Sequence, residues 1–461
     1  MLKFYNSLTK KIEEFTPYDK DNVKLYTCGP TVYHFAHIGN LRTYVMEDVL
    51  ERTLNFLGYH VTRAMNITDV GHLSNDSDYG DDKMVKSAER EHKSVMDIAK
   101  FYTEAFKKDC KALNIKWPEI VVPATSVIDE YIKIISALLE KDYAYISNGN
   151  VYFDVSKLKE YYVLTGHSAN ENLVGVREGV EYDEGKRNQA DFVLWFTKSK
   201  FADQELKWES PWGLGYPGWH IECTGISIKY LGEHLDIHCG GVDNKFPHHT
   251  NEIAQSESYL GHPWCHYWFH TQHLNNETGK MSKSKGEFTT VELLKEKGYD
   301  PLAYRFYLLQ SHYSKPLLFS YDRLDGSQVA YDKLKKSIAM VQNDGEFDID
   351  VYDKILTKFK ETISNDLNTA MAITMVYDVL KLETSGATKI KLIQKFDEVL
   401  ALNLVDSKVD DIPKEIKQLA ELRWQAKLNK DWMNADILRD EIANKGYVVL
   451  DNKDGYKVEK K

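Results

Sequence analysis

The sequence predicts an α/β protein with a Rossmann-like nucleotide fold, and three patterns support this prediction. Residues 23–28 have the composition of a short buried strand that Gly29-Pro30 ends. Apolar residues at three- to four-residue spacing then predict a helix over 41–57, and 60–67 reads as a second strand. The third pattern is a further helix and strand over 219–238. Together they indicate strand–helix–strand units of a parallel sheet.

An insertion and a linker divide the chain further. Helical periodicity over 84–113 and 126–141 is followed by strand-like runs such as Val151-Tyr152-Phe153, which predict an α+β insertion that splits the nucleotide fold. From Val291 onward the sequence is increasingly helical. The acidic stretch that ends at Pro413 is the best linker candidate, so a small C-terminal module is expected after it.

Length and composition predict a globular, cytoplasmic protein. The 461 residues, of which 43% are apolar, suffice for a large core and about two to four domains. The N-terminus lacks an apolar signal segment, and no window approaches the ~18 apolar residues of a membrane span. Five scattered cysteines argue against a disulfide framework and favour thiols or metal ligands. A net charge of −11 argues against a diffuse basic surface for nucleic acid, although Lys280, Lys283 and Lys285 are clustered.

Two short motifs far apart in the chain carry the strongest functional signal. They are His37-Ile38-Gly39-Asn40 and Lys280-Met281-Ser282-Lys283-Ser284. Five specified positions match by chance about once per 10⁶ sites when each residue type has a frequency of about 5%. The first motif lies in a strand-to-helix loop, beside the unpaired amides of a helix N-terminus that favour phosphate binding. The two ammonium groups of the second suit the charge that develops on pyrophosphate.

Each motif also has a purely structural alternative. His37 could cap the helix while Gly39 only permits a tight turn, and the lysine-rich run could be a solvated loop. Because both motifs occur in one chain, we favour the functional interpretation.

A set of candidate metal ligands forms the next pattern. Cys28, Cys223 and the run 247–252 offer thiols, imidazoles and a carboxylate. On a helix that starts near Pro247, His248 and Glu252 would share a face. Two thiolates, an imidazole and a carboxylate suit tetrahedral Zn²⁺. The alternative is one buried thiol, one incidental thiol and a solvent-facing helix. Spacing does not eliminate the rival histidines His220, His234, His238 and His249.

These residues belong to a longer series of segments, and through that series the chain resembles the cysteinyl-tRNA synthetases, a family of class I aminoacyl-tRNA synthetases. The resemblance extends from end to end. The segments that carry it are 28–33, 37–40, 42–43, 66–69, 191–195, 210–213, 217–223, 246–252, 280–284 and 366–369. The chain departs from the family pattern at His34-Phe35, at Asn40 where the signature ends in His, at Tyr216 and at Thr250.

The resemblance implies a Rossmann-like class I catalytic domain split by an α+β connective insertion, then a helical bundle and a small anticodon-binding module. The segments expected from this are 1–118 and 206–285 for the halves of the catalytic domain, 119–205 for the insertion, 286–325 for a stem-contact region, 326–405 for the bundle and 406–461 for the anticodon-binding module.

The resemblance also implies the site residues. One zinc ion per chain would be held by Cys28, Cys223, His248 and Glu252. L-Cysteine would contact Cys28, Thr68, Trp219 and Asp243. ATP would contact Pro30, His37, Gly39, Asn40, Lys280, Met281, Ser282, Lys283 and Ser284, of which His37, Asn40, Lys280 and Lys283 are the implied catalytic residues.

The implied reaction is the ATP-dependent ligation of L-cysteine to tRNA(Cys) through cysteinyl-adenylate, with Mg²⁺ accompanying ATP. A monomer that does not bind membranes is expected. One alternative is a related ligase that joins cysteine to an amino sugar, and another is an inactive zinc- and nucleotide-binding regulator. Residues 326–461 argue against the first, and the intact motifs argue against the second. Trp424 and Trp432 could stack on tRNA bases, although their helical spacing favours core positions.

Overall fold

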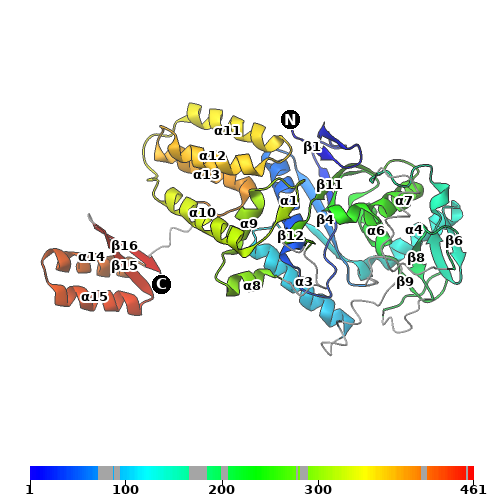
Figure 1. Cartoon of the computed structure of the whole chain (residues 1–461), viewed down its shortest axis with the longest axis horizontal. Helices are drawn as coiled ribbons and strands as arrows, with labels where there is room; N and C mark the ends of the chain where they lie inside the picture. The colour runs from blue at the N-terminus through cyan, green and yellow to red at the C-terminus, as the bar shows by residue number, and fades with distance from the viewer. Residues whose placement is uncertain are drawn as a thin grey trace. The chain divides into compact units, whose positions relative to one another are not determined.

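The computed structural model describes residues 1–70, 87, 94–165, 184–198, 206–276, 279–280, 289–405, 413–452 and 455–460. The chain forms two compact units, Met1–Leu404 and Val405–Lys461, and each is described by itself (Figure 1). The predicted surface loop over 71–81 lies outside the described residues. No helix in the described part of the chain combines the length and apolar character needed to cross a membrane.

The larger unit is built on a five-stranded parallel sheet with the strand order β11-β10-β3-β4-β5. Its strands are β3 (Val23–Thr27), β4 (Val61–Ile67), β5 (Ile120–Pro123), β10 (Leu235–Gly241) and β11 (Cys265–Thr271). From β3 the chain adds β4 and β5 in one direction, and β10 and β11 later extend the sheet in the other. This order is that of a Rossmann-like fold and confirms the predicted α/β class.

Helices cover both faces of this sheet. In Figure 1 α1 lies on one side, and α6 and α7 lie on the other. The helices of this part are α1 (Ile38–Phe56), α3 (Val95–Ala112), α4 (Ile128–Glu140), α6 (Trp219–Leu231) and α7 (His248–Leu260). The core between sheet and helices contains buried aromatic residues such as Tyr26, Tyr131, Trp264 and Trp268.

The predicted insertion boundary at residue 119 differs from the structure. Ala64 of β4 opposes Ile120 of β5 in a parallel ladder, so β5 extends the catalytic sheet. The separate antiparallel sheet has the order β6-β7-β8-β9, with β6 (Ala144–Ser147), β7 (Asn150–Phe153), β8 (Phe192–Phe196) and β9 (Tyr216–Pro217). A short apolar run fits an edge strand of either sheet, and therefore its pattern does not assign it to one. The other segment boundaries stay predictions.

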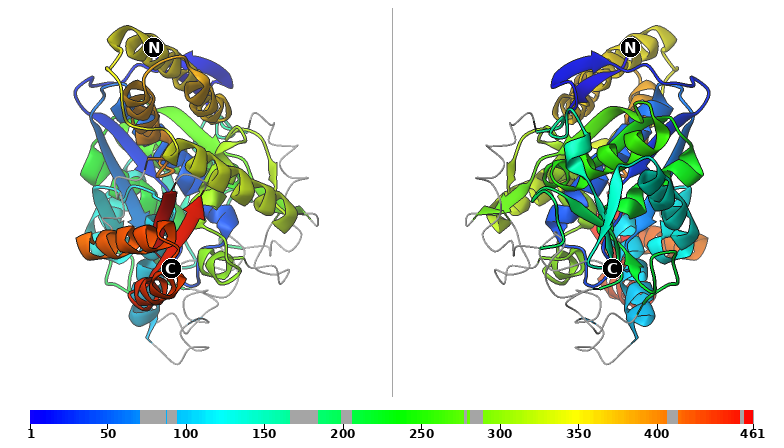
Figure 2. Two further views of the ribbon diagram at one scale, coloured as in Figure 1. Left: turned by 90° about the vertical axis from the view of Figure 1, so that its left-hand side faces the viewer. Right: turned by 90° about the vertical axis from the view of Figure 1, so that its right-hand side faces the viewer.

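The remaining elements of the larger unit are mostly helical. A three-stranded sheet has the order β13-β12-β14, with β12 (Leu274–Asn276), β13 (Gly279–Lys280) and β14 (Leu317–Leu318). The helices are α8 (Val291–Glu296), α9 (Pro301–Leu309), α10 (Tyr321–Ala339), α11 (Ile349–Ser364), α12 (Thr369–Lys381) and α13 (Gly386–Leu400). The N-terminal hairpin of β1 (Lys3–Asn6) and β2 (Lys11–Glu14) lies beside these helices, because the Asp366 amide donates to the Lys3 carbonyl at 2.8 Å (Figure 2).

A buried ionic cluster fastens α1 to the helical part of this unit. Asp48 Oδ2 accepts hydrogen bonds from Arg305 Nη2 at 2.6 Å and from Arg52 Nε at 2.8 Å. Asp48 Oδ1 accepts from the Lys116 amide at 2.7 Å. Burial by itself raises the pKa of Asp48, but the two arginines and the amide outweigh burial and hold the pKa below its usual value.

The smaller unit is a helical hairpin followed by a β-hairpin. Its elements are α14 (Lys414–Leu428), α15 (Trp432–Asn444), β15 (Tyr447–Asn452) and β16 (Gly455–Lys460). Ile416, Ala420 and Ile442 form its core. Arg423 binds both carboxylate oxygens of Asp451, at 2.7 and 2.9 Å. The prediction of a core position is wrong for Trp432, which is 59% exposed, because Ile442 is the residue of α15 that enters the core of this small unit.

Asp48→Asn should lower the free energy of unfolding of the larger unit by about 3–5 kcal/mol, because Arg305 would stay buried without its charged partner. Denaturant-induced unfolding measures this loss. The depressed pKa of Asp48 means that its stabilisation is present above the unfolded value of about 3.9 and is lost as the pH falls through the folded value. The difference between wild type and variant should therefore narrow in acid.

The control variant is Glu292→Gln, which removes the exposed ion pair with Lys108 at 3.2 Å. Its unfolding curve should coincide with that of the wild type, since exposed pairs contribute little. Similar losses in both variants would contradict the assignment of a special role to Asp48.

Candidate active site

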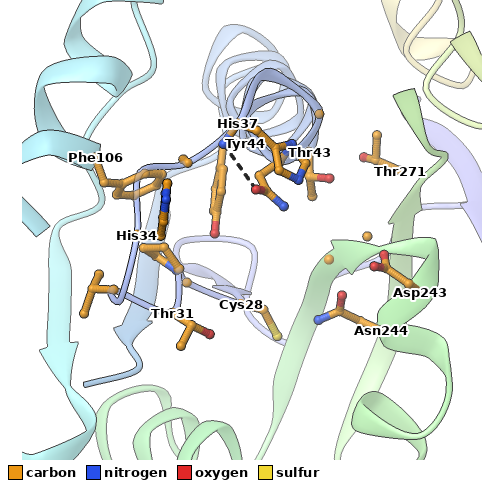
Figure 3. Close-up of a pocket in the computed structure, with 18 of the residues that line it drawn as sticks. Cys28, Thr31, His34, His37, Thr43, Tyr44, Phe106, Asp243, Asn244 and Thr271 are labelled. Carbon is orange, nitrogen blue, oxygen red and sulfur yellow. Dashed lines mark hydrogen bonds between the residues drawn. The ribbon is translucent and has the colours of Figure 1, made fainter. Parts of the chain in front are cut away.

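A cavity of about 340 Å³ opens at the carboxyl ends of β3 and β10, where the strand order of the parallel sheet reverses. In doubly wound sheets this is the position at which ligands bind. Figure 3 shows Cys28 between two walls, one formed by Thr31 and His34 and the other by Asp243 and Asn244. Several chain segments therefore converge on one space, among them the loop after β3, the start of α1 and the turn η3 (Val242–Lys245).

The first motif forms the start of α1 at the mouth of this cavity. His37 is the N-cap residue, and its Nδ1 accepts a hydrogen bond from the Asn40 amide at 3.1 Å. Asn40 Oδ1 in turn accepts from the His37 amide at 3.4 Å, which completes a capping box. The capping alternative is thus correct, and yet His37, Gly39 and Asn40 also line the cavity. The partly positive end of α1 faces a space that an anion could occupy.

Part of the second motif lies close to the same cavity. Lys280 is in β13, and its register partner in β12 is Asn275, next to the cavity-lining residue Leu274. Met281, Ser282, Lys283 and Ser284 lie outside the described residues.

Four candidate metal ligands converge below the cavity. Ligand atoms of Cys28, Cys223, His248 and Glu252 all lie within 4.8 Å of one another. Cys28 Sγ is 4.0 Å from Cys223 Sγ and 4.0 Å from Glu252 Oε1. His248 Nε2 is 3.5 Å from Cys223 Sγ and 3.0 Å from Glu252 Oε1. The structure thus brings together the four residues that the resemblance implied, from the loop after β3 and from α6 and α7.

A second ligand set overlaps with the first. Cys28, His238, His249 and Glu252 also lie within 4.8 Å of one another. His238 Nε2 is 2.8 Å from Glu252 Oε2, and His249 Nε2 is 3.3 Å from Cys28 Sγ.

The other two rival histidines lie elsewhere. His220 Nδ1 contacts His248 Nδ1 at 2.9 Å and belongs to neither described set. His234 packs against Tyr18 and His262 and likewise belongs to neither set. The structure therefore narrows the open choice of histidine ligands to His238, His248 and His249.

Burial dominates the electrostatics of the ligand cluster. It raises the pKa of Cys28 well above its ordinary value, and the neighbouring Cys223 and Glu252 raise it further. Burial also raises the pKa of Cys223 and of Glu252, although His238 counteracts the shift at Glu252. A divalent cation would reverse these shifts, since metal binding releases protons from thiols and carboxyls.

Two of the remaining predicted substrate contacts line the cavity and one does not. Trp219 and Asp243 are in the wall, and the Trp219 ring stacks on His248 with centroids 4.2 Å apart. Thr68 is buried behind the wall at 1% exposure. Its hydroxyl donates to Glu222 Oε2 at 2.8 Å and accepts from Asn66 Nδ2 at 2.9 Å. Thr68 therefore supports the wall instead of forming it.

Asn66 fixes the loop that carries Cys28. Its Oδ1 accepts a hydrogen bond from the Gly29 amide at 2.7 Å. A Cβ atom at Gly29 would lie 1.6 Å from the Asn66 carbonyl oxygen, so no larger residue fits without displacement of the loop. Glycine at this position is required by close backbone approach.

Several lining residues had no functional prediction from the sequence. Tyr44, Phe106 and Asn244 line the cavity. Tyr44 lies one turn beyond Asn40 on α1, and Asn244 follows Asp243, so proximity to predicted residues was a usable signal. Phe106 comes from α3, and nothing in its local sequence indicates that α3 reaches the cavity.

Comparisons with known proteins agree with this architecture. Residues 14–329 match the family described as "tRNA synthetases class I (C) catalytic domain". The chain is 42% identical over 481 residues to the "Cysteine--tRNA ligase" of Borrelia garinii subsp. bavariensis, with 100% of both chains covered. It is 42% identical over 485 residues to that of Treponema denticola, with 98% of both covered. A solved structure, Mycobacterium tuberculosis methionyl-tRNA synthetase in complex with methionyl-adenylate, shares the fold with a TM-score of 0.50 and 14% identity over 83% of this chain and 90% of that chain.

Gly29→Ala should displace the loop after β3 and lower the thermal unfolding midpoint by several degrees, because the added methyl group collides with backbone. Differential scanning calorimetry measures the shift. Gly326→Ala is the matched control: its added Cβ meets nothing within 4 Å, and it lies inside α10. That change should raise stability slightly, by about 0.5–1 kcal/mol. If both variants behaved alike, the close approach at Gly29 would not be a constraint.

Proposed function

Because the chain belongs to the class I cysteine–tRNA ligases, we propose that it ligates L-cysteine to tRNA(Cys) with ATP, through a cysteinyl-adenylate. The observation that carries this proposal is the convergence of two thiols, an imidazole and a carboxylate beneath a cavity whose mouth is the N-terminus of α1. The same space thus combines a thiol-selective metal centre with a phosphate site.

We infer that Cys28, Cys223, His248 and Glu252 hold one zinc ion. Bonds of about 2.0–2.3 Å around a tetrahedral centre separate ligand atoms by about 3.3–3.8 Å. Four of the separations in the cluster are 3.0, 3.5, 4.0 and 4.0 Å, which fit this geometry with small movements. This set is favoured over the overlapping one because it contains two thiols and the other contains one.

The neighbouring histidines then act on the ligands. His238 contacts the second oxygen of Glu252, and His220 contacts Nδ1 of His248, as partners that orient metal ligands do. When bound, zinc would supply a Lewis-acid centre that favours a substrate thiolate far more than the hydroxyl of serine. Ordinary pocket contacts separate substrates by only about 10–200-fold per methylene-sized difference, so metal ligation supplies the remaining selectivity.

The chain's own residues position the substrates. Asp243 is the anionic group of the wall and is proposed to bind the ammonium group of cysteine, while Trp219 packs over His248 and closes the metal side. The amides at the start of α1, with His37 and Asn40, are proposed to bind the phosphates of ATP. Lys280 and Lys283, with Mg²⁺, would neutralise the pyrophosphate as the cysteine carboxylate attacks the α-phosphate in line.

The smaller unit is proposed to contact tRNA. It has its own core, and the exposed Trp432 and Arg439 offer a stacking surface and a cation. Arg423 is held by Asp451 and would have to exchange that partner to contact RNA. An independently folded unit of this kind argues against the alternative of an amino-sugar ligase.

The proposed function predicts two activities that differ in their requirement for tRNA. The purified protein should exchange pyrophosphate into ATP only when L-cysteine is present, and should attach cysteine to tRNA(Cys) in a charging assay. Exchange without charging would favour the amino-sugar ligase, which would then be tested with glucosamine-type acceptors. If the zinc-loaded protein showed neither pyrophosphate exchange nor tRNA charging, the proposal would be refuted.

Cys223→Ser should reduce bound zinc well below one equivalent per chain and weaken cysteine activation in parallel, since a hydroxyl is a poor replacement for a thiolate. Elemental analysis gives the zinc content, and exchange assays with cysteine and serine give discrimination. Cys110→Ser is the control, because Cys110 is a buried thiol that belongs to neither ligand set. Full zinc content in Cys223→Ser would show that the ligand assignment is wrong.

A further inference from the structure

Arg42 is a buried cation without a carboxylate partner among the described residues. It lies in the first two turns of α1, its side chain is fully buried, and no described ion pair includes it. Its guanidinium donates only to backbone carbonyls: Nη1 to His273 at 2.5 Å, and Nη2 to Lys315 at 2.6 Å and His312 at 3.3 Å. Burial of a charge is expensive unless the charge is paired and hydrogen-bonded, and at Arg42 the three carbonyls provide that compensation.

The carbonyls that Arg42 binds precede two strands of the three-stranded sheet. His273 comes immediately before β12, and Lys315 comes shortly before β14. β14 pairs with β12 through Leu274↔Leu317, and β12 pairs with β13, which contains Lys280. Arg42 of α1 therefore binds the chain just before β12 and β14, and the sheet that these strands form contains Lys280, the first residue of the second motif.

A second connection links α1 to Thr289, which follows the second motif in the chain. The Ile38 amide, at the first residue of α1, donates to the Thr289 carbonyl at 2.9 Å. The Ile38 carbonyl accepts from the Tyr304 hydroxyl at 2.8 Å. Both Lys280 and Thr289, which flank residues 281–288, are thus connected to the first two turns of α1. These turns also contain His37 and Asn40 of the first motif.

We propose that Arg42 is a positioning residue of the adenylation step: it sets the distance between the phosphate-binding end of α1 and the sheet that carries Lys280. This inference rests on the proposed function. Arg42 does not line the cavity, so it acts through β12 and β13 and not on a substrate. Its planar fork donates to three backbone carbonyls, and the single ammonium group of a lysine does not reproduce that fork.

The test compares Arg42→Lys and Arg42→Met with the wild type in cysteine-dependent pyrophosphate exchange. A misplacement of about 1 Å can cost up to about 10²-fold in rate, so kcat should fall by about 10–100-fold. KM for cysteine and zinc content should not change, because the proposed metal ligands lie in the loop after β3 and on α6 and α7. Hydrogen exchange should quicken in the amides of 274–276 and 317–319, which reports the loss of the anchor without any substrate.

Tyr331→Phe is the matched control. Tyr331 is also fully buried, and its hydroxyl also donates to a backbone carbonyl, that of Leu402 at 2.7 Å, but both residues lie in the helical part of the unit. Its variant should lose thermal stability while kcat, measured well below the unfolding transition, stays near that of the wild type.

Each outcome decides the matter. An unchanged kcat in folded Arg42 variants would overturn the inference. So would amide hydrogen exchange at β12 and β14 that stays as slow as in the wild type. Equal losses of kcat, zinc content and cysteine affinity would show that Arg42 only stabilises the fold, and would overturn the inference as well. A wild type without cysteine-dependent exchange would refute the proposed function, and the hydrogen-exchange comparison would still show whether Arg42 anchors the sheet.

Discussion

The parallel pairing of β3 with β10 is the contact on which the site depends. The strands are far apart in sequence, yet Leu25 opposes Ile237 and the Cys28 amide donates to the Cys239 carbonyl at 3.3 Å. Because the strand order reverses here, the segments that follow the two strands diverge and leave an opening at their carboxyl ends. The cavity, the start of α1 and the metal-ligand cluster all use this opening, so a sequence that lost this pairing would lose every part of the site together.

Buried polar contacts, and not apolar packing alone, fix the position of α1. Arg63 of β4 pairs with Glu47 at 3.2 Å and Arg305 of α9 pairs with Asp48 at 2.6 Å, while Arg42 binds carbonyls before β12 and β14. A shift of α1 by one turn, about 5.4 Å, would separate all of these groups at once. Apolar side chains could find new neighbours after such a shift, whereas each unpaired buried charge would cost about 3–5 kcal/mol. These contacts hold the first motif at the mouth of the cavity.

Local patterns predicted the parts of the structure that local physics determines. β3 and α1 follow from apolar spacing, and the four-residue spacing of His248 and Glu252 placed both on one helical face. Two expectations failed because they depend on distant contacts. Ile120 belongs to the parallel sheet, and the sequence of a short apolar strand does not indicate which strand it pairs with. Trp432 is exposed because the small C-terminal core is complete without it. The histidine ligands stayed open for the same reason, since only the fold shows which rings meet the thiols.

The capping geometry explains how Asn40 serves at a position where the family signature has histidine. The Asn40 amide donates to His37 Nδ1, and the Asn40 side-chain oxygen accepts from the His37 amide, so the two residues close a ring around the first turn. This ring needs a short acceptor at position 40 and no positive charge. The groups with positive character at this end of α1 are backbone amides, which do not depend on the side chain. A neutral amide at position 40 therefore keeps the helix start, and with it the proposed phosphate site.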